Sequence, residues 1–553
     1  MDFRRYFLWG ALFVSGYLLF LQWNQDYGPQ SQTSQPVAQN QTTVNTATNA
    51  ESDLPNSVSN TTLPASDTDV PANAKALASG QLIDVKTDTL DISIDPVGGD
   101  LVGASLLQYK KTLDASDPFV ILENNTTRTY VSQSGLIGQD GIDNSKGRPT
   151  YHADKTQYVL ADGENTLDVN LYFTDEKGVE YTKTYRFTRG VYSVEQSITV
   201  NNTSADDWRG KQFAQIKRDS TEDPSTATSL GLQPYLGGAI STDEVRYEKV
   251  SFSDMEEKPA KITTNSGWIA LLQHYFVSAW IPKQGETVTL QTRSNNGINF
   301  IGFTGPEVEV PAGQKGTLSA TFYVGPKLQD QLAATAANLD KTVDYGMLWW
   351  LAEPLFWLLT AIQSVVINWG VAIILIVVCV KAVFFKLSAA SYRSMAKMRK
   401  FGPELTRLRE QYGDDRQKMS QAMMTLYKKE KINPLGGCLP ILVQMPVFLS
   451  LYWVLMESVE LRHAPFMLWI NDLSYMDPYY VLPILMGLSM LGQQMLNPTP
   501  PDPMQARIMK IMPIAFTFFF LWFPSGLVLY WVVNNTLSII QQYVITKRIE
   551  AGK

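Results

Sequence analysis

Apolar segments long enough to cross a lipid bilayer constrain this chain more than any other feature. One begins near the N-terminus, and five more follow one another after residue 354. The hydrocarbon core of a bilayer is about 30 Å thick and needs roughly 20 apolar residues in a helix. We therefore predict a multi-pass α-helical membrane protein with six spans: residues 1–23, 355–380, 434–456, 479–496, 508–522 and 526–545.

The first of these segments is predicted to be an uncleaved anchor. Arg4 and Arg5 precede it and Asp26 follows it, which favours a helix that starts in the cytoplasm. A cleavable signal peptide is the alternative, but such a peptide ends in small residues. This segment ends instead in Phe20-Leu21-Gln22-Trp23-Asn24.

The loops between the spans differ in charge. Residues 386–433 carry 12 Lys and Arg against 5 Asp and Glu, whereas residues 457–478 carry only Arg462 against four acids. Basic loops remain in the cytoplasm. The charges therefore predict cytoplasmic N- and C-termini, a cytoplasmic loop 386–433, and a large region outside the cytoplasm between the first two spans.

That outer region divides into two parts. Residues 24–80 are rich in Gln, Asn, Ser, Thr, Ala and Pro, which predicts a flexible linker. Residues 81–340 contain short segments in which apolar and polar residues alternate, which predicts a large extracytoplasmic antiparallel β-sandwich domain. The clearest of these segments are Leu90 to Ile94, Leu167 to Phe173, Val179 to Phe187 and Val191 to Val200, with turns at residues 175–178 and 188–190.

Two further segments belong to the membrane region, residues 341–553. Aromatic residues around Trp349 and Trp350 favour the membrane interface, which predicts a helix over residues 342–353 on the outer surface. An extension of the next span is the alternative. The loop 386–433 is predicted to be a cytoplasmic hairpin of two helices, with its turn at residues 412–415 and Asp414 or Asp415 capping the second helix.

Composition excludes several classes of protein. Two Cys and three scattered His predict no disulfide scaffold and no metal site, and no phosphate-binding loop or nucleophile motif is present. A net charge of −7 argues against a DNA-binding protein. The sequence thus predicts no cofactor and no enzymatic activity.

Polar residues within the spans are costly in lipid and are therefore informative. Lys381 directly follows the second span, Gln444 lies inside the third, and Gln493 and Gln494 lie near the end of the fourth. In the sixth span Trp531, Asn535, Ser538 and Gln542 are spaced to share one helical face. These groups could line a wet cavity, and Lys381 could equally extend its side chain to the cytoplasmic headgroups. No acid within the last five spans is available to pair with Lys381.

Several motifs occur in order over about 150 residues, and with this architecture they resemble the long Gram-negative form of the YidC family of membrane protein insertases. They are Ser394-Met395-Ala396-Lys397-Met398, Gly413-Asp414-Asp415, Asn433-Pro434-Leu435-Gly436-Gly437-Cys438, Gln444-Met445-Pro446, Asp477-Pro478-Tyr479-Tyr480, Asp502-Pro503-Met504-Gln505, and residues 521–530.

The resemblance implies that the last five spans form a five-helix insertase core around a hydrophilic groove that is open to the cytoplasm and to lipid. The groove carries one basic residue, and Lys381 is at the matching position, where the family usually has Arg. Gln444, Gln494 and Trp531 match groove positions, and Asn535 lies on the polar face defined above. The outer domain should be a periplasmic β-supersandwich similar to sugar-mutarotase folds, and no sugar chemistry is carried over from that likeness.

The function expected from this resemblance is insertion and folding of nascent inner-membrane proteins, alone or with the Sec translocon, in the bacterial inner membrane. Expected partners are nascent membrane proteins, the Sec translocon, membrane lipid and, weakly through the cytoplasmic loops, the ribosome. A small-molecule transporter is the alternative, although no internal repeat is visible. An anchored periplasmic carbohydrate enzyme would leave the polar face and the cytoplasmic hairpin unexplained.

Overall fold

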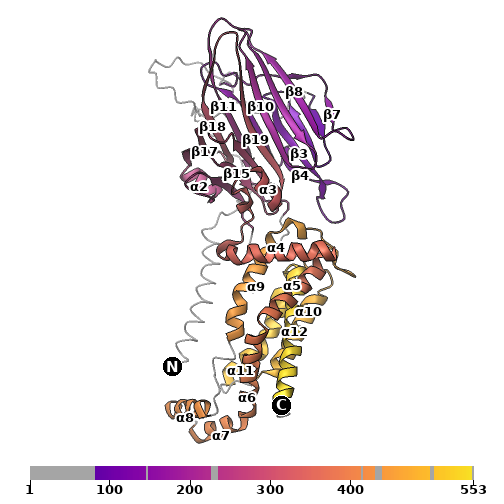
Figure 1. Ribbon diagram of the computed structural model, residues 1–553, viewed down its shortest axis with the longest axis vertical. Helices are drawn as coiled ribbons and strands as arrows, with labels where there is room; N and C mark the ends of the chain where they lie inside the picture. The colour runs from indigo at the N-terminus through magenta and orange to yellow at the C-terminus, as the bar shows by residue number, and fades with distance from the viewer. Residues whose placement is uncertain are drawn as a thin grey trace, which may run out of the picture.

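The computed structural model describes residues 81–144, 147–225, 234–412, 415–429, 439–497 and 503–550. A β-domain stands on one end of a helical bundle, and helices α6 to α8 lie at the bundle's other end (Figure 1). The predicted anchor, residues 1–23, and the predicted linker, residues 24–80, lie outside the described residues.

The β-domain contains two sheets, as the alternating sequence pattern predicts. Within the described residues the first sheet has ten strands, in the spatial order β14 (Lys261–Thr264), β17 (Val288–Asn295), β18 (Ile298–Val310), β11 (Trp208–Asp219), β5 (Thr129–Ile137), β4 (Pro118–Asn124), β3 (Asp100–Lys110), β2 (Leu90–Asp95), β1 (Ile83–Lys86) and β7 (Gln157–Val159). The second has nine, in the order β13 (Glu248–Val250), β12 (Gly237–Ser241), β15 (Trp268–Leu272), β16 (Phe276–Pro282), β19 (Lys315–Pro326), β10 (Ser193–Asn201), β9 (Glu180–Thr188), β8 (Thr166–Thr174) and β6 (His152–Ala153).

Strand pairing in both sheets is antiparallel, with the exception of the edge pair β1 and β7. The four predicted strands are confirmed as β2, β8, β9 and β10. Asp175 fixes the predicted turn between β8 and β9, because its carboxylate accepts hydrogen bonds from the backbone of Lys177 and Val179 at 2.9 Å each. Gly178 takes the positive φ of 88° that this turn needs.

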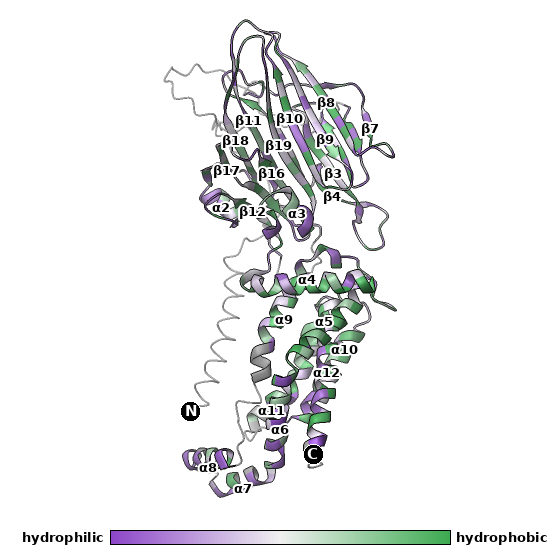
Figure 2. Cartoon of the chain, viewed as in Figure 1, coloured by the Kyte–Doolittle hydropathy of each residue, from purple (hydrophilic) through white to green (hydrophobic). Residues whose placement is uncertain are grey.

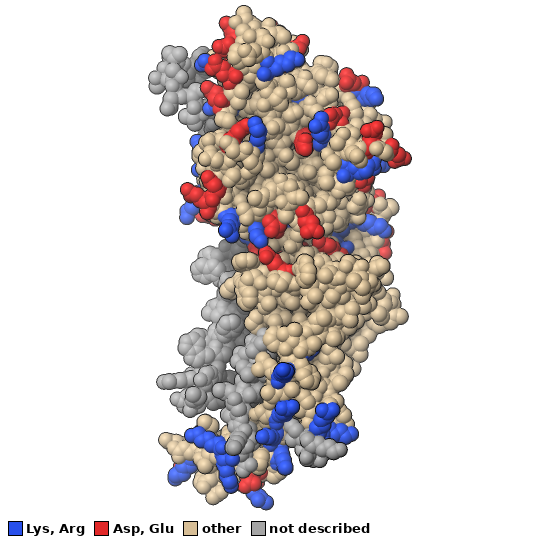
Figure 3. All heavy atoms as spheres, viewed as in Figure 1, with Lys and Arg blue, Asp and Glu red and all other residues tan. Residues whose placement is uncertain are grey.

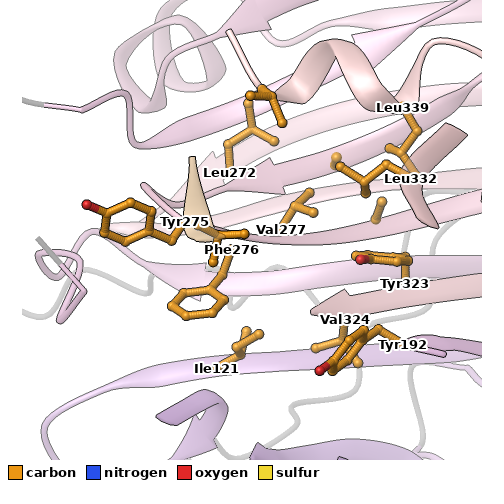
Figure 4. Packing of buried hydrophobic residues seen from close by; sticks show 14 of the residues in the cluster. Ile121, Tyr192, Leu272, Tyr275, Phe276, Val277, Tyr323, Val324, Leu332 and Leu339 are labelled. Carbon is orange, nitrogen blue, oxygen red and sulfur yellow. The ribbon is translucent and has the colours of Figure 1, made fainter. Parts of the chain in front are cut away.

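The core of the β-domain lies between the two sheets. Fully buried residues alternate with less buried ones along strands such as β10, so each strand turns one face into the core. Trp280 of the second sheet contacts Phe303 of the first, with ring centroids 6.4 Å apart. Figure 4 shows this packing around Phe276 and Tyr323, with Leu332 of the short helix α3 (Gln329–Thr335) beside the same cluster.

The C-terminal region is helical. Its helices are α4 (Trp349–Val366), α5 (Trp369–Val383), α6 (Phe385–Lys400), α7 (Gly402–Tyr412), α8 (Arg416–Lys429), α9 (Leu439–Glu457), α10 (Val481–Leu496), α11 (Pro503–Phe519) and α12 (Ser525–Glu550). Hydrophobic residues dominate α4, α5, α9 and α10, whereas α6, α7 and α8 are largely hydrophilic (Figure 2). The uncharged surface of the bundle separates the charged β-domain from basic side chains at its far end (Figure 3).

The predicted single span 355–380 is wrong, and so is the end of the predicted interfacial helix at residue 353. One helix, α4, runs from Trp349 to Val366 and lies across the end of the bundle (Figure 1). Ile367 then adopts a left-handed conformation with φ of 55°, and α5 begins after Asn368. The Asn368 side chain accepts a hydrogen bond from the backbone of Val371 at 3.0 Å, which caps α5 and separates the two helices.

The prediction of two helices in residues 386–433 is also wrong. In the described part of this segment the structure has three, because α6 follows α5 directly and only α7 and α8 form a hairpin. The cap is confirmed at Asp415, whose carboxylate accepts hydrogen bonds from the backbone of Gln417 and Lys418 at 3.1 Å each. The alternative cap, Asp414, lies outside the described residues.

Length and apolar composition identify one described helical segment, Gly346–Val366, that could cross a membrane by itself. The pair Trp369–Val383 and Phe385–Lys400, bent by 69°, raises the number to two if the pair counts as one broken span. The number of six spans therefore stays a prediction, and the structure establishes a β-rich domain of two mostly antiparallel sheets followed by a helical region.

The two regions contact each other where α9 ends. A ring nitrogen of His274, which lies just before β16, is 2.9 Å from the Met456 carbonyl oxygen. Arg462, just after α9, donates hydrogen bonds to the carbonyl oxygens of Lys110 and Lys111 at 2.8 and 3.0 Å. These contacts hold the base of the β-domain against the helix that carries Gln444.

Candidate functional site

Lys381 lies in the last turn of α5 and turns its side chain toward α12. Its ammonium nitrogen donates a hydrogen bond to the Ser538 hydroxyl at 2.7 Å. The side chain is only partly exposed. The structure therefore directs the Lys381 ammonium toward α12.

The polar face of α12 meets two neighbouring helices. Asn535 donates a hydrogen bond to the Ser489 hydroxyl of α10 at 3.1 Å. Gln542 donates one to the side-chain oxygen of Asn497, just past α10, at 2.9 Å. The structure thus turns Asn535 and Gln542 toward α10 and Ser538 toward α5, and all three side chains are buried.

Gln444 of α9 reaches the same helix. Its side-chain nitrogen donates a hydrogen bond to the side-chain oxygen of Asn534. Sequence reasoning missed Asn534. The Ser538 hydroxyl donates a hydrogen bond to the Asn534 carbonyl oxygen at 2.7 Å. The four-residue spacing between Asn534 and Ser538 is the sequence signal that could have identified it.

Trp531 packs between aromatic rings. Its ring centroid lies 4.9 Å from that of Phe448 of α9 and 5.9 Å from that of Phe520. The buried indole nitrogen has no hydrogen-bond partner among the described residues. Trp531 thus lies at the contact between α9 and α12, where its indole N–H makes no hydrogen bond to the described residues.

Gln494 is half-buried near the end of α10, and its carbonyl oxygen accepts the backbone hydrogen bond of Asn497 at 3.1 Å. The structure therefore places it one turn from the residue that Gln542 contacts. A hydrogen bond between Gln494 and Lys381 is absent from the described contacts, so the two share a region of the bundle rather than a direct contact.

The site can offer one cation and several neutral hydrogen-bonding groups. Among the described residues Lys381 has no carboxylate within ion-pair distance, and a serine hydroxyl is its recorded partner. Buried oxygens of Ser391 in α6 and Gln542 in α12 also lack partners there. Such a set can receive an acidic or polar group.

The described residues contain no cluster of three or more His, Cys, Asp or Glu side chains that could hold a metal ion. The predicted absence of a metal and a cofactor stays a prediction for the rest of the chain.

Comparisons with known proteins cover nearly the whole chain. The family model of the YidC periplasmic domain matches residues 82–358, and that of the 60Kd inner membrane protein matches residues 361–552. The membrane protein insertase YidC of Marinomonas sp. (strain MWYL1) is 72% identical over 552 residues, covering 100% of both chains. The membrane protein insertase YidC of Stutzerimonas stutzeri (strain A1501) is 55% identical, covering 100% of this chain and 99% of its own.

A crystal structure of an active YidC insertase with its first transmembrane domain resolved aligns with a TM-score of 0.38 at 16% identity, covering 84% of this chain and 93% of that chain. The sequence matches, at far higher identity and over the full length, establish the relationship. The chain belongs to the YidC family of membrane protein insertases, proteins of the bacterial inner membrane.

Proposed function

We propose that this insertase works through the polar site between α5, α9, α10 and α12, and that Lys381 provides its charge. The observation that carries the proposal is the contact of the Lys381 ammonium with the Ser538 hydroxyl, without an acid among its described partners. A cation held by a neutral hydroxyl can exchange that contact for a carboxylate. An arginine at the same position would add a bidentate geometry that Lys lacks.

The substrate is a nascent hydrophobic segment with a short polar flank. The flank enters the site from the cytoplasm and pairs transiently with Lys381, while Gln444, Gln494, Asn535 and Trp531 offer neutral hydrogen bonds or aromatic contact. Polar side chains in the site shorten the apolar distance that the flank must cross. A weak pairing is required, because a tightly held flank would not be released.

Energy for insertion comes from partitioning and not from a chemical step. Burial of the apolar segment in lipid contributes roughly 25 cal/mol per Å². The membrane potential adds about 2.3 kcal/mol per negative charge per 100 mV as an acidic flank moves outward. No ATP, cofactor or covalent intermediate takes part in this mechanism.

The proposed topology has the β-domain in the periplasm and both termini in the cytoplasm, with residues 1–23 as an anchor, residues 24–80 as a linker and six spans. The surface in Figure 3 supports it, because the basic side chains lie at the end of the bundle away from the β-domain. In this orientation α4 lies at the outer membrane surface, where exposed Trp349, Trp350 and Trp357 suit the interface.

The proposed partners are nascent membrane proteins, the Sec translocon and lipid, with weak ribosome contact through α7 and α8. The basic ends of α6 and α8 support that contact, with Lys397, Arg399 and Lys400 on α6 and Lys428 and Lys429 on α8.

Site-specific photo-crosslinking tests the proposed substrate path. A photoreactive residue at Gln444 or Asn535 should crosslink to a ribosome-bound nascent chain that carries an acidic flank. The matched control is Ile484, which lies exposed on α10. Crosslinks from Ile484 alone would place the substrate outside the polar site and contradict the proposal.

A further inference from the structure

Two buried arginines in the β-domain have guanidinium nitrogens without acceptors. Arg218 of β11 is fully buried, and Arg128, just before β5, is 7% exposed. The Nε and one terminal nitrogen of each lack a hydrogen-bond partner among the described residues. Buried guanidinium groups almost always pair with an acceptor, because leaving such donors unmade in a dry interior costs several kcal/mol.

The two guanidinium groups flank the same aromatic ring. The central carbon of Arg218 lies 5.0 Å from the centroid of Tyr130, and that of Arg128 lies 5.4 Å from it. Ser132, two residues along β5, is 1% exposed, and its hydroxyl also lacks a partner. The unpartnered donors therefore gather around Tyr130, on β5, β11 and the loop before β5.

Nearby carboxylates are engaged elsewhere. Asp219 accepts hydrogen bonds from the backbone of Thr129 and Thr221. Asp223 accepts them from the Gln273 side chain and the His274 backbone at 2.9 and 2.7 Å. Neither forms an ion pair with Arg218, whose recorded acceptor is the Thr221 carbonyl oxygen at 2.9 Å.

Glu123 contacts only one of the two arginines, Arg128. It forms a salt bridge with one terminal nitrogen of Arg128 at 2.8 Å, and its side chain is 31% exposed, at the rim of the cluster. Burial lowers the pKa of Arg218, and this effect outweighs the opposing influence of Tyr130, Asp223 and Asp219.

We propose that the β-domain binds a small inorganic anion of the halide class beside Tyr130, at the unpartnered guanidinium nitrogens of Arg128 and Arg218. Arg is well suited to this role because its charge is permanent and its donors are fixed in a plane. A monovalent halide fits an enclosed site better than phosphate, because less charge has to leave water. The site is distinct from the helical bundle and goes beyond the proposed insertion mechanism.

The anion would stabilise the junction with the membrane region. Asp223, five residues after Arg218, holds the backbone of His274, and His274 contacts Met456 at the end of α9. An anion bound to Arg218 would therefore restrain the segment from Arg218 to Asp223, which contacts His274 at the junction.

Thermal unfolding of the full chain in detergent, followed by near-UV circular dichroism, tests the proposal. Chloride is exchanged for gluconate at constant ionic strength. We expect a saturable rise of about 3–6 °C in the Tm of the β-domain at ten times the Kd. Arg218→Met should abolish this rise, whereas Arg186→Met, which alters an exposed arginine paired with Asp168, should retain it.

A direct measurement covers the case in which Arg218→Met does not fold. Crystals of the unaltered protein grown in bromide should give an anomalous peak within hydrogen-bond distance of both guanidinium groups. Equal Tm values in chloride and gluconate, or bromide peaks at the surface only, would overturn the proposal and assign the donors to buried water.

Discussion

Two largely buried cations of the β-domain, Arg148 and Lys183, have more partners than Lys381 in the bundle. Arg148, between β5 and β6, forms ion pairs with both Asp100 and Asp143, and Lys183 of β9 donates to the carbonyl oxygens of Gly98 and Ser134 at 2.9 and 2.8 Å. Lys381 has one neutral hydroxyl. The ion pairs of Arg148 stabilise the fold, whereas the single exchangeable partner of Lys381 agrees with the proposal that this cation receives a substrate.

The largest effect should follow from breaking the saturated network. Arg148→Ala leaves the Asp100 and Asp143 carboxylates buried without their partner, and we expect the free energy of unfolding of the β-domain to fall by about 3–5 kcal/mol. Urea denaturation of the full chain measures this loss. Insertion should remain near the parental rate wherever the protein stays folded.

Arg186→Ala is the matched control, because Arg186 pairs with Asp168 on the exposed surface of β8 and β9. Its effect on unfolding should be small. Equal losses for the two variants would show that the buried network contributes no more than a surface pair.

A smaller effect is expected at the junction between the two regions. Arg462→Ala removes two hydrogen bonds and the stacking of the guanidinium on Phe119 and Phe276, at 5.3 and 5.6 Å from the ring centroids. We expect this change to weaken the docking of the β-domain on the helical region by about 2 kcal/mol. The distribution of spin–spin distances between labels at Val159 and Ile484, on a background without Cys379 and Cys438, should broaden.

Lys177→Ala is the control, because it removes an exposed salt bridge to Asp140 that includes none of the junction residues. It should leave the distribution of spin–spin distances unchanged. An unchanged distribution for Arg462→Ala as well would mean that other contacts fix the orientation of the β-domain.

The pH dependence of stability sharpens the comparison further. Burial lowers the pKa of Lys183 to about 7, from 10.5. Between these two values the unfolded chain binds more protons than the folded chain, so stability rises with pH, by up to about 1.4 kcal/mol per pH unit. Urea denaturation between pH 7.5 and 9.5, a window chosen between those two pKa values, should show the slope in the parent and lose it in Lys183→Met. The same slope in both proteins would assign it to other groups.

Sequence patterns predicted much of the fold, for physical reasons that particular residues illustrate. Alternation in β8 to β10 identified the strands, because one face of each is buried. The break between α4 and α5 was missed because hydropathy continues through it. The signal was Asn368, whose capping side chain interrupts an otherwise apolar run.

Residues of the proposed site stood out in the sequence where the cost of burying a polar group is high. Lys381 and Asn535 stand out among apolar neighbours, and Asn535 contacts Ser489 of α10 as its helical face suggested. The partners were not predictable, because Ser538 of α12 lies 157 residues from Lys381 along the chain. The cluster of Arg128 and Arg218 was likewise hidden, since only the pairing of β5 with β11 brings it together.

Insertion of a short two-span protein into liposomes, assayed by protease protection, tests the central claim most directly. Purified parent, Lys381→Ala and Lys381→Arg are compared, each with an acidic and an uncharged flank on the substrate. The account predicts that Lys381→Ala slows insertion of the acidic-flanked substrate about tenfold, which corresponds to a rise of about 1.4 kcal/mol in the activation free energy. Lys381→Arg should insert this substrate near the parental rate. Equal loss for the uncharged flank, or no loss for either, would contradict the pairing of Lys381 with the substrate.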